Sequence, residues 1–183
     1  MRRVARWVWA VAVAAVLLSC GAGRYGYDVE YVPLKEEKKW TAEVTEINYE
    51  EIRRDPLNYA DATLGWFGVV EEVLSDEGGK LTVLCSYRTH QKRHLCEDKF
   101  DKKSCRVTVS KKSPGTFTTT IEPTEESDLM GKNKIQTNSL VKVYGKATGE
   151  YDSEGGPMLE TYWFRHWPPG QYVDTGAASF MLQ

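Results

Sequence analysis

The chain has 183 residues, which is enough for one ordinary domain and a short extension. It carries 24 Lys and Arg against 26 Asp and Glu, so its net charge of −2 disfavours the broad basic surface that a nucleic-acid-binding protein needs. The first 19 residues differ in composition from the rest.

The N-terminal residues have the three parts of a secretory signal. Arg2, Arg3 and Arg6 form a positive region, Trp7 to Leu18 form an apolar run, and the small Ser19 follows. As a helix, the apolar run would reach only about 18 Å, well short of the roughly 30 Å of a bilayer core. We therefore expect a cleaved signal peptide over residues 1–19 rather than a transmembrane helix.

The sequence Leu17-Leu18-Ser19-Cys20-Gly21 resembles the lipobox of bacterial lipoproteins. This resemblance implies cleavage before Cys20, attachment of one lipid group with two fatty acyl chains, such as palmitate, to its thiol, and acylation of the new amine. The mature chain of 164 residues would carry 21 basic and 26 acidic residues, a net charge of −5. Gly21 occupies the position where aspartate is the usual inner-membrane retention signal, so outer-membrane anchoring is expected by analogy. The alternative is an ordinary signal peptide in which the cysteine occurs by chance.

Residues 20–47 show no apolar periodicity and are expected to form a flexible, lipidated tether. Asn48 with Glu51 three residues later resembles a capping box, which predicts a short helix over residues 49–54 that ends before Pro56.

From residue 63 the apolar pattern alternates as in strands. Gly68 interrupts the first strand, where a barrel needs a bulge or a close backbone approach. Trp66 and Phe67 are neighbours on a strand, so one faces the core and the other faces outward. The outward ring is expected either to pack under the segment of residues 48–59, which contains the short helix, or to mark a binding face. Three strands, a short helix or turn near residues 123–131, and two more strands match the order of an OB-fold. The expected strands cover residues 63–74, 80–87, 105–109 (extended by or paired with 117–121), 140–148 and 158–167.

These residues also carry a family resemblance. The stretch Leu64-Gly65-Trp66-Phe67-Gly68 resembles the entry of OB-fold domains in lipoproteins. Val143-Tyr144-Gly145 followed by His166-Trp167-Pro168 resembles the close of the starvation-inducible outer-membrane lipoprotein family. The strand order predicts an all-β, five-stranded OB-fold-like barrel with a short preceding helix, and the resemblance carries over no catalytic residue. The expected organisation is signal peptide 1–19, tether 20–47, barrel domain 48–173 and C-terminal tail 174–183.

The insertion at residues 88–104 departs from that family. In an oxidising compartment, Cys96 and Cys105 are expected to form a disulfide across a polar loop, whereas Cys85 lies on an apolar strand face and is expected to be a buried free thiol. An alternative is a metal site, with zinc held by the two cysteines together with His90 and His94.

The function indicated is a non-catalytic structural or protein-binding domain of the cell envelope, with no cofactor and no enclosed small-molecule ligand. No nucleophile elbow or phosphate-binding glycine loop is present, and His166 is expected to be packed at the end of a strand. Binding is expected on the outer face of the barrel and on the loops at 88–104 and 149–157. The alternative is binding of single-stranded nucleic acid or oligosaccharide by the OB-fold, using Lys92, Arg93, Lys102 and Lys103.

Overall fold

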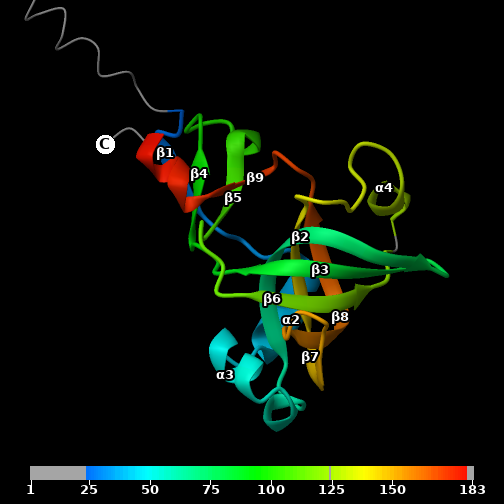
Figure 1. Ribbon diagram of the computed structural model, residues 1–183. Coiled ribbons are helices and arrows are strands. Elements are labelled where there is room, and N and C mark those ends of the chain that lie inside the picture. The colour runs from blue at the N-terminus through cyan, green and yellow to red at the C-terminus, as the bar shows by residue number, and fades with distance from the viewer. Residues whose placement is uncertain (1–23, 124, 181–183) are drawn as a thin grey trace, which may run out of the picture.

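The computed structural model describes residues 24–123 and 125–180, whose strands form a closed barrel and a smaller sheet lying against its outer face (Figure 1). Within these residues, no helix is long and apolar enough to cross a bilayer. The barrel strands, in the order in which they pair, are β2 (Leu64–Glu77), β3 (Lys80–Arg88), β6 (Thr116–Ile121), β8 (Pro157–Trp167) and β7 (Leu140–Tyr151).

The strand order and directions are those of an OB-fold, which confirms the predicted fold class. β6 and β8 run parallel, and the other neighbours in the barrel are antiparallel. One strand assignment was wrong: β6 is the third barrel strand, whereas the segment expected to occupy that position, β5 (Cys105–Val109), belongs to the smaller sheet. Both segments are apolar and alternating, so their period alone cannot say which sheet each one joins.

The barrel interior is filled by side chains from all five strands. Trp66, Val83, Phe117 and Val143 are buried there with others of the same apolar cluster. Gly68 allows the close approach that the sequence predicted, because a Cβ at this position would lie 2.7 Å from the Cβ of Cys85 and 2.7 Å from the ring of Phe117.

The smaller sheet covers an apolar patch on the outside of the barrel. Phe67, facing away from its interior neighbour Trp66, is buried in a second cluster with Val107, Leu140 and Trp167. It therefore packs under the smaller sheet and not under the preceding helix. The sheet has the order β1 (Tyr27–Glu30), β4 (Arg93–Cys96), β5 and β9 (Tyr172–Asp174).

The remaining elements are short. The helix α3 (Tyr49–Arg54) has the predicted bounds, and the side chain of its N-cap residue Asn48 accepts a hydrogen bond from the backbone N–H of Glu50. The others are the helices α2 (Lys35–Glu43) and α4 (Glu126–Leu129) and the 3₁₀ turns Leu57–Tyr59, Lys102–Ser104 and Thr175–Phe180.

The segment expected to be a tether is largely folded, which corrects the boundary at residue 47. β1 pairs with β4, and Glu37 of α2 contacts the barrel strand β7, so a tether could only lie before β1. Sequence periodicity missed both elements because β1 has only four residues and α2 exposes most of its side chains.

A buried carboxylate holds α2 in place. Glu37 has no exposed surface, and its oxygens accept hydrogen bonds from the Lys142 ammonium at 2.7 Å, the Tyr144 hydroxyl at 2.9 Å and the backbone N–H of Leu34 at 3.0 Å. The Tyr31 hydroxyl also donates to it. Burial alone would raise the pKa of Glu37, but the hydrogen bonds from Lys142 and Tyr31 outweigh burial and lower the pKa below its usual value.

We predict that Glu37→Gln lowers the free energy of unfolding by about 3–5 kcal/mol, because it leaves the largely buried Lys142 ammonium without its counter-ion. Urea unfolding at pH 7 measures this change. Glu36→Gln is the matched control, since the neighbouring Glu36 is exposed and should change stability by less than about 0.5 kcal/mol. Equal effects of the two substitutions would contradict the role given to Glu37.

Candidate functional site: a groove between the two sheets

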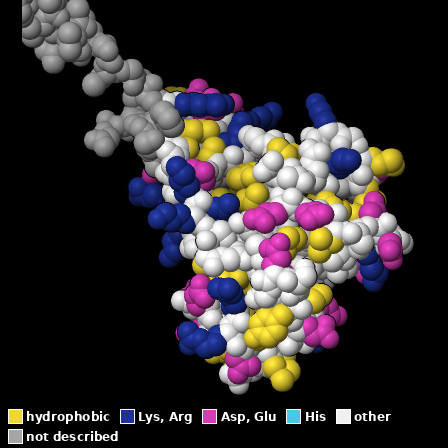
Figure 2. Space-filling view, in the orientation of Figure 1, with side chains coloured by type: hydrophobic (Ala, Val, Ile, Leu, Met, Phe, Trp, Pro, Cys, Tyr) yellow, Lys and Arg dark blue, Asp and Glu magenta, His cyan; other side chains and the backbone are white. Residues whose placement is uncertain are grey.

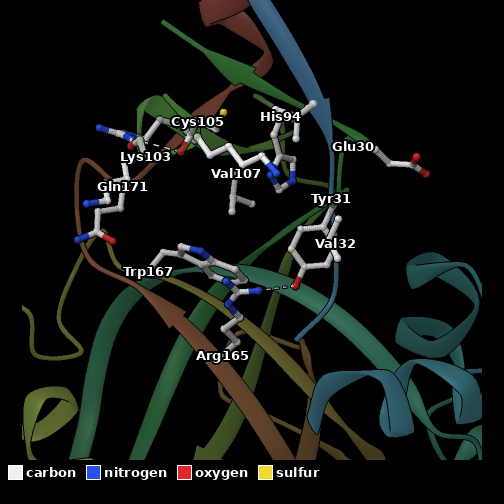
Figure 3. A pocket seen from close by; sticks show the side chains of 13 residues that line it. Glu30, Tyr31, Val32, His94, Lys103, Cys105, Val107, Arg165, Trp167 and Gln171 are labelled. Carbon is white, nitrogen blue, oxygen red and sulfur yellow. Dashed lines mark hydrogen bonds between the residues drawn. The ribbon is translucent and has the colours of Figure 1, made fainter. Parts of the chain in front are cut away.

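A groove of about 830 Å³ opens between the outer face of β8 and the smaller sheet (Figure 3). Arg165 and Trp167 rise from β8 on one side, and β4 and β5 contribute His94 and Val107 on the other. The full lining is Val29, Glu30, Tyr31, Val32, His94, Lys102, Lys103, Cys105, Arg106, Val107, Arg165, Trp167 and Gln171.

Arg165 is positioned by contacts on several sides. Because it lies two residues before Trp167 on one strand, both side chains leave the barrel on the same face, and its guanidinium lies 4.6 Å from the Trp167 ring centroid. Its Nη1 donates to the Tyr31 hydroxyl at 3.2 Å and lies 3.4 Å from a carboxylate oxygen of Glu37. The side chain keeps 26% of its surface exposed, so it can still donate to a ligand in the groove.

The groove is positively charged although the protein as a whole is acidic. Lys102, Lys103, Arg106 and Arg165 line it, and Glu30 is the only carboxylate in its lining. Figure 2 shows Lys and Arg side chains gathered along one edge of the molecule, at the level of the smaller sheet. The groove is therefore suited to a ligand that carries negative charge.

His94, which lines the groove, contacts a second histidine, His90, that lies outside the groove lining. The Nε2 atoms of His90 and His94 lie 3.1 Å apart, the His90 ring stacks on Phe67 at 4.6 Å, and Tyr31 lies edge-on to His90 at 5.0 Å. Burial lowers the pKa of each histidine to about 4; the charge of Lys142 adds to this for both. Both rings are thus neutral at pH 7, and the Nε2–H of one donates a hydrogen bond to the Nε2 of the other.

The predicted disulfide is confirmed: Cys96 and Cys105 are joined, and Cys85 is a buried free cysteine. The proposed four-ligand zinc site is wrong, since sulfurs in a disulfide are not thiolate ligands. Across the described part of the chain, no group of three or more His, Cys, Asp or Glu residues is placed to hold a metal ion. Cys20 lies outside the described residues.

His166 lies at the centre of an arrangement that sequence reasoning did not anticipate. Its Nδ1 is 3.1 Å from Asp128 and its Nε2 is 3.2 Å from the hydroxyl of Ser139, the connectivity of a catalytic triad. However, Ser139 is fully buried and its hydroxyl accepts the backbone N–H of Gln136 at 3.1 Å, so no substrate carbonyl can approach it. The three residues instead fasten the connection between α4 and β7 to the end of β8.

The structure separates the basic residues that the sequence grouped together. Lys102 and Lys103 line the groove, whereas Lys92 and Arg93 line another depression, of about 460 Å³, beside His90. The loop at residues 149–157 lies outside the groove lining.

Sequence reasoning missed Arg165 and Tyr31 as groove residues. The only available signal for Arg165 was its place beside His166 and Trp167, because the ion pair that orients it joins residues 128 positions apart.

In comparisons with protein-family models, with curated proteins and with solved structures, no match is found.

We predict that stability falls as the pH is lowered from 6.5 towards 4. In the unfolded chain His90 and His94 have pKa values near 6.5, whereas burial in the folded protein lowers both to about 4, so the unfolded state takes up protons first. The slope is at most about 1.4 kcal/mol per pH unit for each histidine, and partial solvent screening reduces it.

Urea unfolding at pH 7 and pH 4.5 measures the effect. A His90→Gln, His94→Gln chain should lose clearly less stability over this interval than the unchanged chain, while His166, whose pKa burial also lowers, titrates in both. An identical loss in the two chains would show that the pair does not titrate as described.

Proposed function

We propose that this chain is a lipid-anchored lipoprotein of the cell envelope, and that its OB-fold-like domain is a non-catalytic module that binds an acidic segment of a protein partner. The observation that carries the proposal is the cation-lined groove outside a barrel whose interior is occupied by its own side chains. A ligand must therefore bind on the outer face.

An acidic peptide segment fits the chemistry of the groove. The Arg165 guanidinium can donate to a carboxylate in bidentate fashion, and Lys102, Lys103 and Arg106 add charge along the opposite side. Val107 and Trp167 form an apolar floor between these charged groups, each with little exposed surface.

The same groove is poorly suited to single-stranded nucleic acid. Bases are bound mainly by stacking on exposed aromatic rings, and Trp167 is only 7% exposed because it packs on Phe67. The groove thus offers charge without an open stacking surface, which favours a protein ligand over the nucleic-acid alternative.

The anchor is supported by the sequence around Cys20, and the outer membrane by Gly21. Catalysis is not proposed, since the cysteine in the groove is oxidised to a disulfide and the buried Ser139 is closed to substrate.

The anchor is tested in intact cells by metabolic labelling with a fatty acid. The unchanged chain should become labelled and be cleaved, whereas Cys20→Ser should remain an unlabelled precursor. A processed chain without label would contradict the lipoprotein proposal.

The groove is tested by site-specific photo-crosslinking in intact cells. A crosslinking residue in place of the exposed Gln171 should give a discrete adduct with a protein, and Arg106→Glu should abolish it by reversing a charge in the lining. The matched controls are a crosslinker at Asp76, at the tip of the β2–β3 hairpin, and Arg53→Glu on α3. An adduct that persists in Arg106→Glu, or that also forms from position 76, would contradict binding in the groove.

A further inference from the structure

The loop that the disulfide closes lies beside the start of the described chain. Tyr27 pairs with Cys96 in the smaller sheet, and the Arg24 side chain forms an ion pair with Glu97 at 2.9 Å. Cys20 precedes Arg24 by four residues, which span at most about 14 Å when fully extended. On the proposed lipid anchor, on which this inference rests, the loop is therefore held next to the bilayer surface.

This loop presents an aromatic side chain to solvent. Phe100 is 91% exposed, more than any other large hydrophobic residue among those described. The loop that holds Phe100 is small, and the disulfide closes its ends. Within it, the Asp98 side chain accepts a hydrogen bond from the backbone N–H of Phe100 at 2.7 Å, and the Ser104 hydroxyl donates one to the Asp101 carbonyl at 2.6 Å. The backbone around Phe100 is therefore already ordered, and it loses little conformational entropy when the side chain moves from water into a bilayer.

The loop belongs to a positively charged segment, although between Cys96 and Cys105 three lysines stand against three carboxylates. Residues 88–112 hold nine Lys and Arg against three Asp and Glu, a surplus of six positive charges, whereas the rest of the mature chain holds 12 against 23. The three carboxylates are engaged: Glu97 with Arg24, Asp98 with the Phe100 N–H, and Asp101 with the Lys103 N–H. Lys99, Lys102 and Lys103 are exposed.

We propose that the Cys96–Cys105 loop is a second membrane contact, which inserts Phe100 into the interface of an anionic phospholipid bilayer and places its lysines against the lipid phosphates. An aromatic residue at the headgroup level and a basic cluster are the two features that interfacial segments use, and each Lys near an anionic surface strengthens binding about fivefold. The contact directs the acidic barrel away from the membrane and fixes the orientation that a lipid anchor alone leaves free.

The test uses a chain that begins at Gly21, which lacks the acyl groups but keeps every residue of the barrel and the smaller sheet. It should co-sediment with vesicles that contain phosphatidylglycerol, more weakly as salt is raised, and should not co-sediment with pure phosphatidylcholine vesicles. Lys99→Glu should weaken binding at least about fivefold, and Phe100→Ser about tenfold. Neither residue lines the groove.

A matched control lies beyond α4, where the exposed Met130 is followed by the exposed Lys132. Met130→Ser and Lys132→Glu remove the same kinds of group, so binding that depends on the loop should be unchanged in both. Equal losses in the control and loop variants, or equal binding to neutral vesicles, would overturn the proposal.

A second measurement uses the acylated chain reconstituted in the same vesicles. Amide hydrogen exchange in residues 97–104 should be slower in phosphatidylglycerol vesicles than in phosphatidylcholine vesicles, and Phe100→Ser should remove the difference. Fatty-acid labelling of Cys20 separates the two proposals: a labelled chain whose loop exchanges equally in both vesicles overturns the membrane contact and leaves the anchor intact. An unlabelled chain overturns the anchor itself.

Discussion

The Glu37 carboxylate joins the N-terminal segment to the barrel, and the position of the smaller sheet depends on this interaction. It accepts hydrogen bonds from Lys142 on β7 and from Tyr31 just after β1, and it pairs with Arg165 on β8. Burying a charge is costly unless hydrogen bonds satisfy it, so alternative placements of α2 would leave Glu37 or Lys142 unpaired. The cluster thereby favours one docking of β1, and the same Arg165 that completes it forms one wall of the groove.

The barrel could be predicted from the sequence because each of its strands carries its own signal. Alternation along Leu81, Val83 and Cys85 shows one inward face, and the glycines at 78 and 79, both with positive φ, mark the turn before them. The smaller sheet has no such local signal. β1 pairs with β4 across more than 60 residues, each has four residues, and β9 has three, so their pairing depends on contacts that periodicity does not report.

In the candidate site, too, local features could be predicted from the sequence and contacts between distant residues could not. Cys96 and Cys105 were predicted to pair because a nine-residue spacing in an oxidising compartment is a local feature. Arg165, Tyr31 and Glu37 come from three separate elements, and nothing in their own neighbourhoods indicates that they meet. Likewise His166 was expected to be packed, as it is, but its bonds to Asp128 and Ser139 depend on how a connection folds back over β8.

The two proposals meet at Lys102 and Lys103, which belong to the disulfide-closed loop and also line the groove. Each ammonium can neutralise one nearby anion well, and a lysine bound to a lipid phosphate contributes less attraction to an acidic peptide. Arg106 and Arg165 face the groove from outside the loop, so their charge would remain available to an acidic peptide if the loop contacted a membrane. Contact of the loop with a bilayer is thus expected to weaken the affinity of the groove for an acidic peptide modestly. The contribution of the two arginines to that affinity would be unchanged.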